Sequence, residues 1–254
     1  MPDKDVIVIK VGTGVLTRGD GTLDAASLAR LVNAVADLPA ASGRVVLVSS
    51  GAVGAGIPAL GLSEYPDDVP TRQAAAAVGQ TRLMHAYENL FRSFEVSVAQ
   101  LLLTAADLEI EDHRQRVSDL LVRLITRPGI VPIINENDSV AVEELSVGDN
   151  DMLSARVATL LGARMLVLLT SVDGLLPPGG GEIVRDVRSV DEVMSYVREE
   201  KGRFAIGGME SKLQAVKLAV EGGVETVIAN GRRPDRLAEI VAGKGHATRF
   251  RVGG

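Results

Sequence analysis

Two short polar strings hold the residues best suited to chemistry. They are NENDSV at residues 135–140 and SVGDNDMLSA at residues 146–155, and the first follows a short apolar run. A buried strand that ends in carboxylates and amides suits a polar substrate and a metal-bound phosphate better than a core. Asp138, Asp149, Asn150 and Asp151 are candidates to receive a substrate amine, to orient lysines or to help hold magnesium. Helix N-capping, which Asp and Asn favour, explains one such residue but not this density.

Two glycine-rich turns follow apolar runs nearer the N-terminus. In VIVIKVGTGVL, Lys10 ends a predicted strand and Gly12 opens a loop whose backbone N–H groups can approach phosphate oxygens. In VVLVSSGAVGAG, Ser50 and Gly51 offer a hydroxyl and a small residue to a carboxylate or phosphate. The first is neither a Walker A loop nor a GxGxxG fingerprint, and the second is no GxSxG elbow. The structural alternatives are a tight strand–helix turn and helix-packing glycines.

Two later segments add hydroxyl groups and a second lysine. LVLLTSVDGLL reads as a strand that ends in Thr170 and Ser171, which suit an adenosine or ribose contact or simply a turn. In AIGGMESKLQAVKLA, Gly207 and Gly208 precede a predicted helix with Lys212 in its first turn. The helix dipole disfavours a cation there, which favours a bound anion, with a solvated lysine as the alternative.

Composition narrows the class of protein. The chain has 254 residues, of which 46% are apolar and 3% aromatic, with no cysteine and a net charge of −6. An aliphatic core suits a parallel sheet covered on both faces by helices. The acidic balance argues against non-specific nucleic-acid binding, and the lack of cysteine excludes disulfides and thiolate metal sites. Without a signal peptide or an apolar run long enough to span a membrane, we expect a cytoplasmic protein with no membrane partner.

Predicted strands alternate with predicted helices along the chain. Apolar runs predict buried strands at residues 6–11, 45–48, 96–103, 130–134, 165–169 and 226–229. Helical spacing predicts helices at residues 25–38, 73–91, 112–125, 151–161, 191–198 and 210–220. The alternation indicates an α/β fold, a three-layer αβα sandwich with a mainly parallel central sheet. We expect one domain over residues 1–254, with lobes at 1–162 and 163–254.

The motifs together resemble the amino-acid kinase superfamily and, within it, the glutamate 5-kinase family. In order they are KVGTGVL, SSGAVGAG, AAVGQTRLM, LLLTAAD, INENDSV, VGDND, LLTSVDGL and GGMESKLQA. They span essentially the whole chain, and INENDSV followed by VGDND is the most specific pair. The resemblance implies the amino-acid kinase fold and phosphorylation of the L-glutamate side-chain carboxylate by ATP with Mg²⁺. That reaction gives L-glutamyl 5-phosphate, the first step of L-proline biosynthesis.

The resemblance also implies roles for individual residues. Lys10 and Lys212 would stabilise the transferring phosphoryl group, and Asp151 would orient both lysines. Glutamate would be held by Ser50, Gly51, Asp138 and Asn150. The nucleotide would be held by Lys10, Gly12, Thr170, Ser171, Ile206, Gly207, Gly208, Met209 and Lys212. Mg²⁺ would bridge the phosphates with no protein ligand, and no general base is needed because a carboxylate is already ionised at neutral pH.

Several features depart from the family pattern or extend it. Gly14 stands where serine is expected, Ser171 where aspartate is expected, and Ile206 where threonine is expected. Because the sequence stops at Gly254, we expect no C-terminal PUA domain of the kind that many bacterial relatives carry. The resemblance suggests a homodimer or homotetramer. It also makes L-proline, which resembles cyclised glutamate, a candidate feedback inhibitor.

Three other interpretations stay open at this point. Another amino-acid kinase, acting on acetylglutamate or a different small acid, would share the fold and the glycine loops. A nucleotide-binding sensor without catalysis would keep the loops, although the presence of Lys10, Asp151 and Lys212 argues against it. A Rossmann dehydrogenase has the least support, because Thr17 occupies the position of the third fingerprint glycine.

Overall fold

An eight-stranded sheet runs through the protein, in a computed structural model that describes residues 5–38, 44–139, 149–199 and 208–253. Its strands are β1 (Val6–Val11), β2 (Arg44–Val48), β3 (Ser97–Leu103), β4 (Ile130–Glu136), β5 (Met165–Thr170), β6 (Asp186–Val187), β7 (Glu225–Asn230) and β8 (Thr248–Phe250). They lie in the order β3-β4-β2-β1-β5-β7-β8-β6. Every neighbouring pair is parallel except β7 and β8, so the predicted mainly parallel sheet is confirmed.

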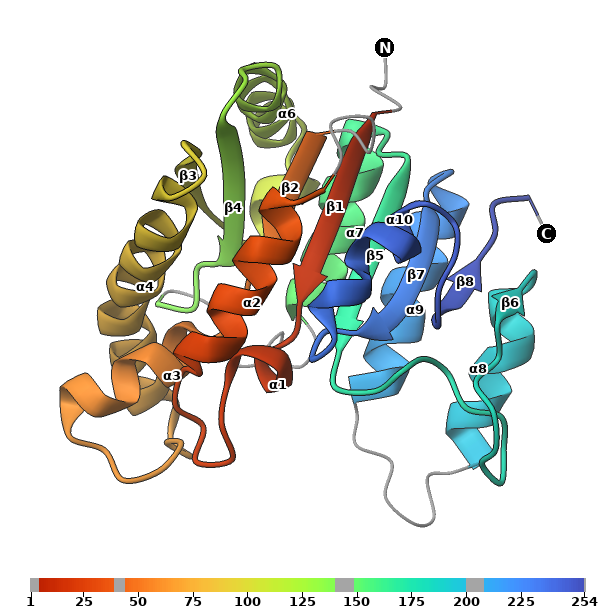
Figure 1. Cartoon of the computed structure of the whole chain (residues 1–254), viewed down its shortest axis with the longest axis horizontal. Coiled ribbons are helices and arrows are strands. Elements are labelled where there is room, and N and C mark those ends of the chain that lie inside the picture. Colours follow the sequence, from red (N-terminus) through yellow and green to blue (C-terminus); the bar gives the residue numbers. More distant parts are fainter. Residues whose placement is uncertain (1–4, 39–43, 140–148, 200–207, 254) are drawn as a thin grey trace.

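Helices cover both faces of this sheet, and Figure 1 shows α2 and α10 in front of the strands with α7 and α9 behind them. One face carries α1 (Thr13–Leu16), α2 (Ala25–Ala36), α3 (Ala52–Gly56), α4 (Val69–Arg92) and α10 (Leu237–Val241). The other carries α5 (Ala105–Glu109), α6 (Glu111–Ile125), α7 (Asp149–Leu161), α8 (Val190–Glu199) and α9 (Gly208–Glu221). The expected αβα sandwich is confirmed. Within the described ranges, no helix is long and apolar enough to cross a membrane.

Side chains of the central strands alternate between two hydrophobic clusters. In β1, Val6 and Val8 pack with α6, α7 and α9, whereas Ile7 and Ile9 pack with α2 and α4. Successive side chains of a strand point to opposite faces. Lys10 therefore continues the series of Val6 and Val8 and faces α7 and α9, the helices that supply the other charged residues of the site.

The sheet order reverses direction at β1. Strands β2, β4 and β3 extend to one side of β1, and β5 and β7 extend to the other. Ligands of open α/β sheets bind outside the carboxyl ends of the strands at such a switch point. The described residues of the polar motifs predicted to carry chemistry lie at or just after the carboxyl end of a strand, or at the start of a helix.

Helices α3 and α4 approach each other too closely for side chains. A Cβ atom built on Gly79 would lie 1.8 Å from the carbonyl oxygen of Ala52, and one on Gly56 would lie 2.0 Å from that of Ala75. The small residues after the Ser50 turn therefore serve packing. Gly51, with φ of +96°, caps α3 in a left-handed conformation that glycine adopts without strain.

Strand β3 was predicted to be buried, and this prediction was wrong. It is the edge strand of the sheet, and Ser97, Gln100 and Leu102 are exposed along it. Strand β4 extends past the predicted end to Glu136, so Asn135 and Glu136 lie within the strand. Strands β6 and β8 were not predicted, because they are only two and three residues long and mostly polar.

Five of the predicted helices begin earlier than predicted, and α4 and α7 are the two that matter for the site. Helix α4 starts at Val69 because the Asp68 side chain accepts a hydrogen bond from the Thr71 N–H, and a proline occupies its first turn. Helix α7 starts at Asp149, which places Asn150 and Asp151 in its first turn. The first turn of α7 therefore presents both side chains to the sheet edge.

We expect Gly79→Ala to destabilise the fold by about 2 kcal/mol, because overpacking costs about 3 kcal/mol and improved helix propensity returns about 1 kcal/mol. Gly19→Ala is the matched control, since Gly19 is exposed and a Cβ atom there meets no atom within 4 Å. Urea unfolding of both variants measures the difference. Equal free energies of unfolding would contradict the close contact between α3 and α4.

Candidate active site

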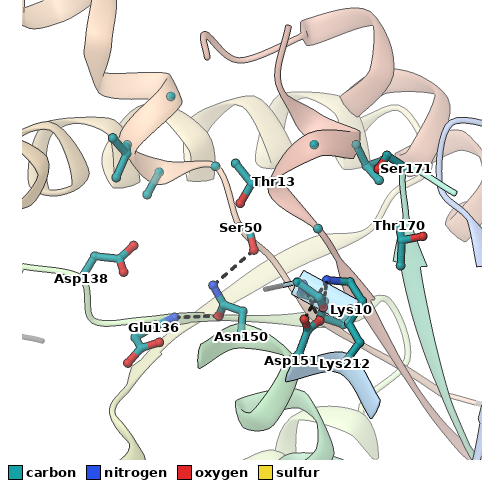
Figure 2. Close-up of a pocket in the computed structure, with 18 of the residues that line it drawn as sticks. Lys10, Thr13, Ser50, Glu136, Asp138, Asn150, Asp151, Thr170, Ser171 and Lys212 are labelled. Atoms are coloured by element: carbon teal, nitrogen blue, oxygen red, sulfur yellow. Dashed lines mark hydrogen bonds and ion pairs between the residues drawn. The ribbon is translucent and has the colours of Figure 1, made fainter. Parts of the chain in front are cut away.

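A cavity of about 360 Å³ opens at the carboxyl ends of β1, β2, β4 and β5 (Figure 2). Its volume lies within the range of small-molecule sites. Most of the residues selected from the sequence line it: Lys10, Gly12, Ser50, Gly51, Asp138, Asn150, Asp151, Thr170, Ser171, Gly208 and Lys212. The structure thus brings together motifs that lie far apart in the sequence, from Lys10 to Lys212.

Three of the predicted nucleotide contacts are not among these lining residues. Met209 is partly buried and packs against the hydrophobic cluster on the face of the sheet that helices α5 to α9 cover. Ile206 and Gly207 lie outside the described residues. Their contacts with a nucleotide stay predictions.

A buried carboxylate shared by two lysines forms the charged centre of the cavity. Lys10 Nζ at the end of β1 lies 2.6 Å from Asp151 Oδ1, and Lys212 Nζ on α9 lies 3.1 Å from Asp151 Oδ2. The Asp151 side chain is only 2% exposed. Lys212 Nζ also donates to the carbonyl oxygen of Gly208, which holds the ammonium over the first turn of α9. Both ammonium groups are therefore fixed before any ligand arrives.

Burial and charge act in opposite directions on Lys10. Burial lowers the pKa of the Lys10 ammonium below its usual value, the Asp151 carboxylate raises it through its charge and a hydrogen bond, and the Lys212 charge lowers it. Desolvation disfavours the charged form, and an adjacent opposite charge restores it. Asp151 thus keeps a buried ammonium available to an anion.

Neutral amides line the neighbouring part of the cavity. Asn150 Nδ2 donates to Ser50 Oγ at 3.2 Å and to Asn135 Oδ1 at 3.1 Å. The Glu136 backbone N–H donates to Asn150 Oδ1 at 3.2 Å, so the amide of Asn150 is held at both ends. Ser50 accepts from Asn150, which leaves its own O–H able to donate toward an anion in the cavity.

Carboxylates lie at one end of the cavity, and two of the residues at this end were not predicted from the sequence. Glu136 and Tyr65 line the cavity beside Asp138 but were not selected from the sequence. Burial raises the pKa of the Tyr65 phenol, and the nearby Asp138 carboxylate raises it further. Glu136 belongs to INENDSV and could have been selected from that motif. No spacing in the sequence relates Tyr65 to Asp138.

The opposite end of the cavity carries hydroxyl groups. Thr170 Oγ1 donates to the Val172 carbonyl oxygen and accepts from the Val172 N–H, so this hydroxyl shapes its own turn. Ser171 is exposed and lines the cavity. The Gly12 N–H donates to the Leu169 carbonyl oxygen at 3.0 Å, so it ties β1 to β5 and is not available to a phosphate.

The functional groups lie in a definite order across the cavity. Figure 2 shows Glu136 and Asp138 on one side, the two lysines around Asp151 in the middle, and Thr170 with Ser171 on the other side. Such an order suits a substrate with a cationic group at the acidic end, and an anion that receives charge stabilisation at the centre. The hydroxyl end remains for the rest of a phosphate-bearing ligand.

Comparisons with known proteins agree with this geometry. The model of the amino acid kinase family matches residues 5–230. A protein of Symbiobacterium thermophilum named glutamate 5-kinase is 44% identical over 250 residues, covering 96% of this chain and 95% of the relative. A glutamate 5-kinase of Salmonella arizonae is 41% identical, covering 98% of this chain and 70% of the relative. Carbamate kinase of Giardia shares the fold, with a TM-score of 0.66, 17% identity and coverage of 97% and 98%. The chain therefore belongs to the amino acid kinase family.

Proposed function

We propose that the protein transfers the γ-phosphoryl group of ATP to the side-chain carboxylate of L-glutamate. The observation that carries this proposal is the Asp151 carboxylate shared by Lys10 and Lys212 between an acidic and a hydroxyl end of one cavity. It is supported by the two curated relatives named glutamate 5-kinase, at 44% and 41% identity. The product, L-glutamyl 5-phosphate, is a precursor in L-proline biosynthesis.

The proposed reaction needs positioning and charge stabilisation more than proton transfer. The ionised glutamate carboxylate attacks the γ-phosphorus, a new carboxyl O–P bond forms, and the bond to the oxygen bridging to ADP breaks. Lys10 and Lys212 stabilise the negative charge on the transferring group, and Asp151 holds both ammonium groups in place. No general base is required, because the nucleophile carries no proton at neutral pH.

The acidic end of the cavity suits the ammonium group of glutamate. Asp138 and Glu136 supply negative charge there, at the far side from the lysines. Ser50 supplies an O–H donor for a carboxylate, and Gly51 lines the cavity beside it. N-acetylglutamate has no ammonium group for this negative charge to attract, which favours glutamate over the acetylglutamate alternative.

ATP at the hydroxyl end would contact Thr170, Ser171 and the first turn of α9 at Gly208. Within the described residues, no group of three His, Asp or Glu side chains is arranged to hold a metal, and Asp151 is already occupied by two lysines. In this proposal Mg²⁺ would arrive with the nucleotide phosphates and keep several waters. When bound there, Mg²⁺ neutralises phosphate charge.

The remaining expectations extend this proposal. A division near Gly162 assigns Ser50, Asp138 and Asn150 to a substrate lobe, and Thr170 and Lys212 to a nucleotide lobe. A homodimer or homotetramer, inhibition by L-proline and a cytoplasmic location stay predictions from the resemblance.

We expect hydroxylamine to trap an acyl phosphate when the protein is supplied with ATP, Mg²⁺ and L-glutamate. With N-acetyl-L-glutamate, kcat/KM should be lower by at least about 10²-fold, because this substrate offers no ammonium group to the negative charge at the acidic end of the cavity. Colorimetric detection of the hydroxamate measures both. Greater turnover of N-acetyl-L-glutamate would overturn the substrate assignment, and ATP binding without either product would favour the sensor interpretation.

Lys212→Ala should lower kcat by about 10²-fold or more, the cost of losing one preorganised group that stabilises transition-state charge. Lys217→Ala is the matched control on the same helix, since Lys217 is 41% exposed and pairs with Asp191 at the surface. We expect the control to keep normal turnover, with both variants assayed at saturating ATP and glutamate. Equal kcat values for the two variants would remove the proposed role of Lys212.

We expect the alkaline limb of the kcat–pH profile of Asp151→Asn to lie at lower pH than that of the wild type. Asp151 raises the pKa of Lys10 against the effect of burial, so its loss lowers that pKa further. The Lys10 ammonium is present below its pKa and lost above it. A lower pKa therefore moves the alkaline limb of the profile to lower pH. Profiles of kcat between about pH 6 and pH 10 measure the shift. An unchanged alkaline limb would be evidence against a catalytic Lys10 ammonium.

A further inference from the structure

Helix α4 places two buried polar side chains behind the substrate half of the cavity. Gln80 and Tyr87 are two turns apart on the face of α4 that packs against the sheet, and Gln80 is only 8% exposed. Gln80 Oε1 accepts a hydrogen bond from Asn135 Nδ2 on β4 at 2.9 Å. Tyr87 shares a hydrogen bond of 2.9 Å with Ser49, the residue before Ser50. Neither Gln80 nor Tyr87 lines the main cavity.

The hydrogen bonds around Asn135 have one direction. The Glu136 backbone N–H, which can only donate, lies 2.9 Å from Asn135 Oδ1 and 3.2 Å from Asn150 Oδ1. Both amide oxygens are therefore turned toward this N–H, and both amide nitrogens are turned away from it. Asn135 Nδ2 must then find an acceptor, and Gln80 Oε1 supplies it.

The same direction continues to the cavity wall. Asn150 Nδ2 uses its two hydrogens on Asn135 Oδ1 and Ser50 Oγ. Ser50 Oγ is thus an acceptor toward Asn150, and its own hydrogen is left to donate into the cavity. Because Gln80 supplies an acceptor, Asn135, Asn150 and Ser50 can each direct the correct atom toward the next residue in this series of hydrogen bonds.

We propose that Gln80 is a positioning residue for the acceptor substrate. Through Asn135 it fixes the amide of Asn150, and through Asn150 it orients the Ser50 hydroxyl as a donor to an anionic group. This inference rests on the proposed function for the identity of that anion, the L-glutamate carboxylate. It adds a residue outside the cavity to those that determine the affinity for glutamate.

The other half of the Gln80 amide supports this role. Gln80 Nε2 is buried and has no hydrogen-bond partner among the residues that the structure describes. A buried N–H without a partner is unfavourable, so a side chain kept for packing alone would be better served by an apolar residue. The oxygen is the part of Gln80 that the structure uses.

Two variants of nearly the same size separate the oxygen from the packing. Gln80→Met keeps the volume and removes the acceptor, whereas Gln80→Glu keeps an acceptor for Asn135. We expect Gln80→Met to raise the KM for glutamate about 10-fold, the scale of one buried hydrogen bond, with the KM for ATP and kcat changed less than about 2-fold. Gln80→Glu should stay within about 3-fold of the wild type. Gln100→Met, at an exposed glutamine of β3, is the control and should change neither KM.

A double-variant comparison tests whether Gln80 acts through Asn150. If it does, adding Gln80→Met to Asn150→Ala raises the KM for glutamate by less than about 2-fold, because the link is already broken. A second increase of about 10-fold in that background would overturn the proposal. So would a Gln80→Met variant that folds and binds glutamate normally, or a Gln80→Glu variant as impaired as Gln80→Met.

Failure of the proposed function has a different signature. A wild-type protein that does not phosphorylate glutamate refutes that function, and the positioning role is then judged from a crystal structure of Gln80→Met. Rotation of the Asn150 amide away from Ser50 would support it, and an unchanged Asn150 would overturn it. If Gln80→Met does not fold, as thermal unfolding would reveal, a crystal structure of Gln80→Glu decides in the same way: the Asn135 and Asn150 amides must keep their orientation.

Discussion

The Asp151 carboxylate between two lysines is the interaction on which the rest of the site depends. Two ammonium groups this close to each other and to a hydrophobic core would lose their charge or move apart without it. One carboxylate at 2.6 Å from Lys10 and 3.1 Å from Lys212 leaves one positive charge in excess, fixed in place. This charge can stabilise an incoming phosphoryl group without further reorganisation of the site.

Three separate elements must meet for this interaction to form, and the sheet order brings them together. Lys10 ends the central strand β1, Asp151 lies in the first turn of α7, and Lys212 lies in the first turn of α9. The alternation of β1 points Lys10 toward the face that α7 and α9 cover. On the opposite face, the close contact at Gly79 holds α4 against α3, so the substrate half is supported from behind.

Sequence reasoning reached the fold and most of the cavity lining because both follow local patterns. Apolar runs of strand length and the polar residues after them identified Lys10, Ser50 and Asp151 as candidate site residues. It failed where position depends on contacts distant in the chain. The exposure of β3 follows from its place at the sheet edge, and the AAVGQTRLM motif that contains Gln80 does not indicate which residue it contacts. Its partner Asn135 is 55 residues away.

The distribution of charge explains why amides, and not more carboxylates, separate the two ends of the cavity. Asp138 and Glu136 attract a cation at one end, while the excess charge of the lysines attracts an anion at the centre. A carboxylate in place of Asn150 would lie next to Asp151 in sequence, could pair with a lysine, and would cancel the excess positive charge. In the proposed function, the neutral amide of Asn150 and the Ser50 hydroxyl would hold the substrate without this competition. The acidic end and the lysines at the centre can then act on one small amino acid at the same time.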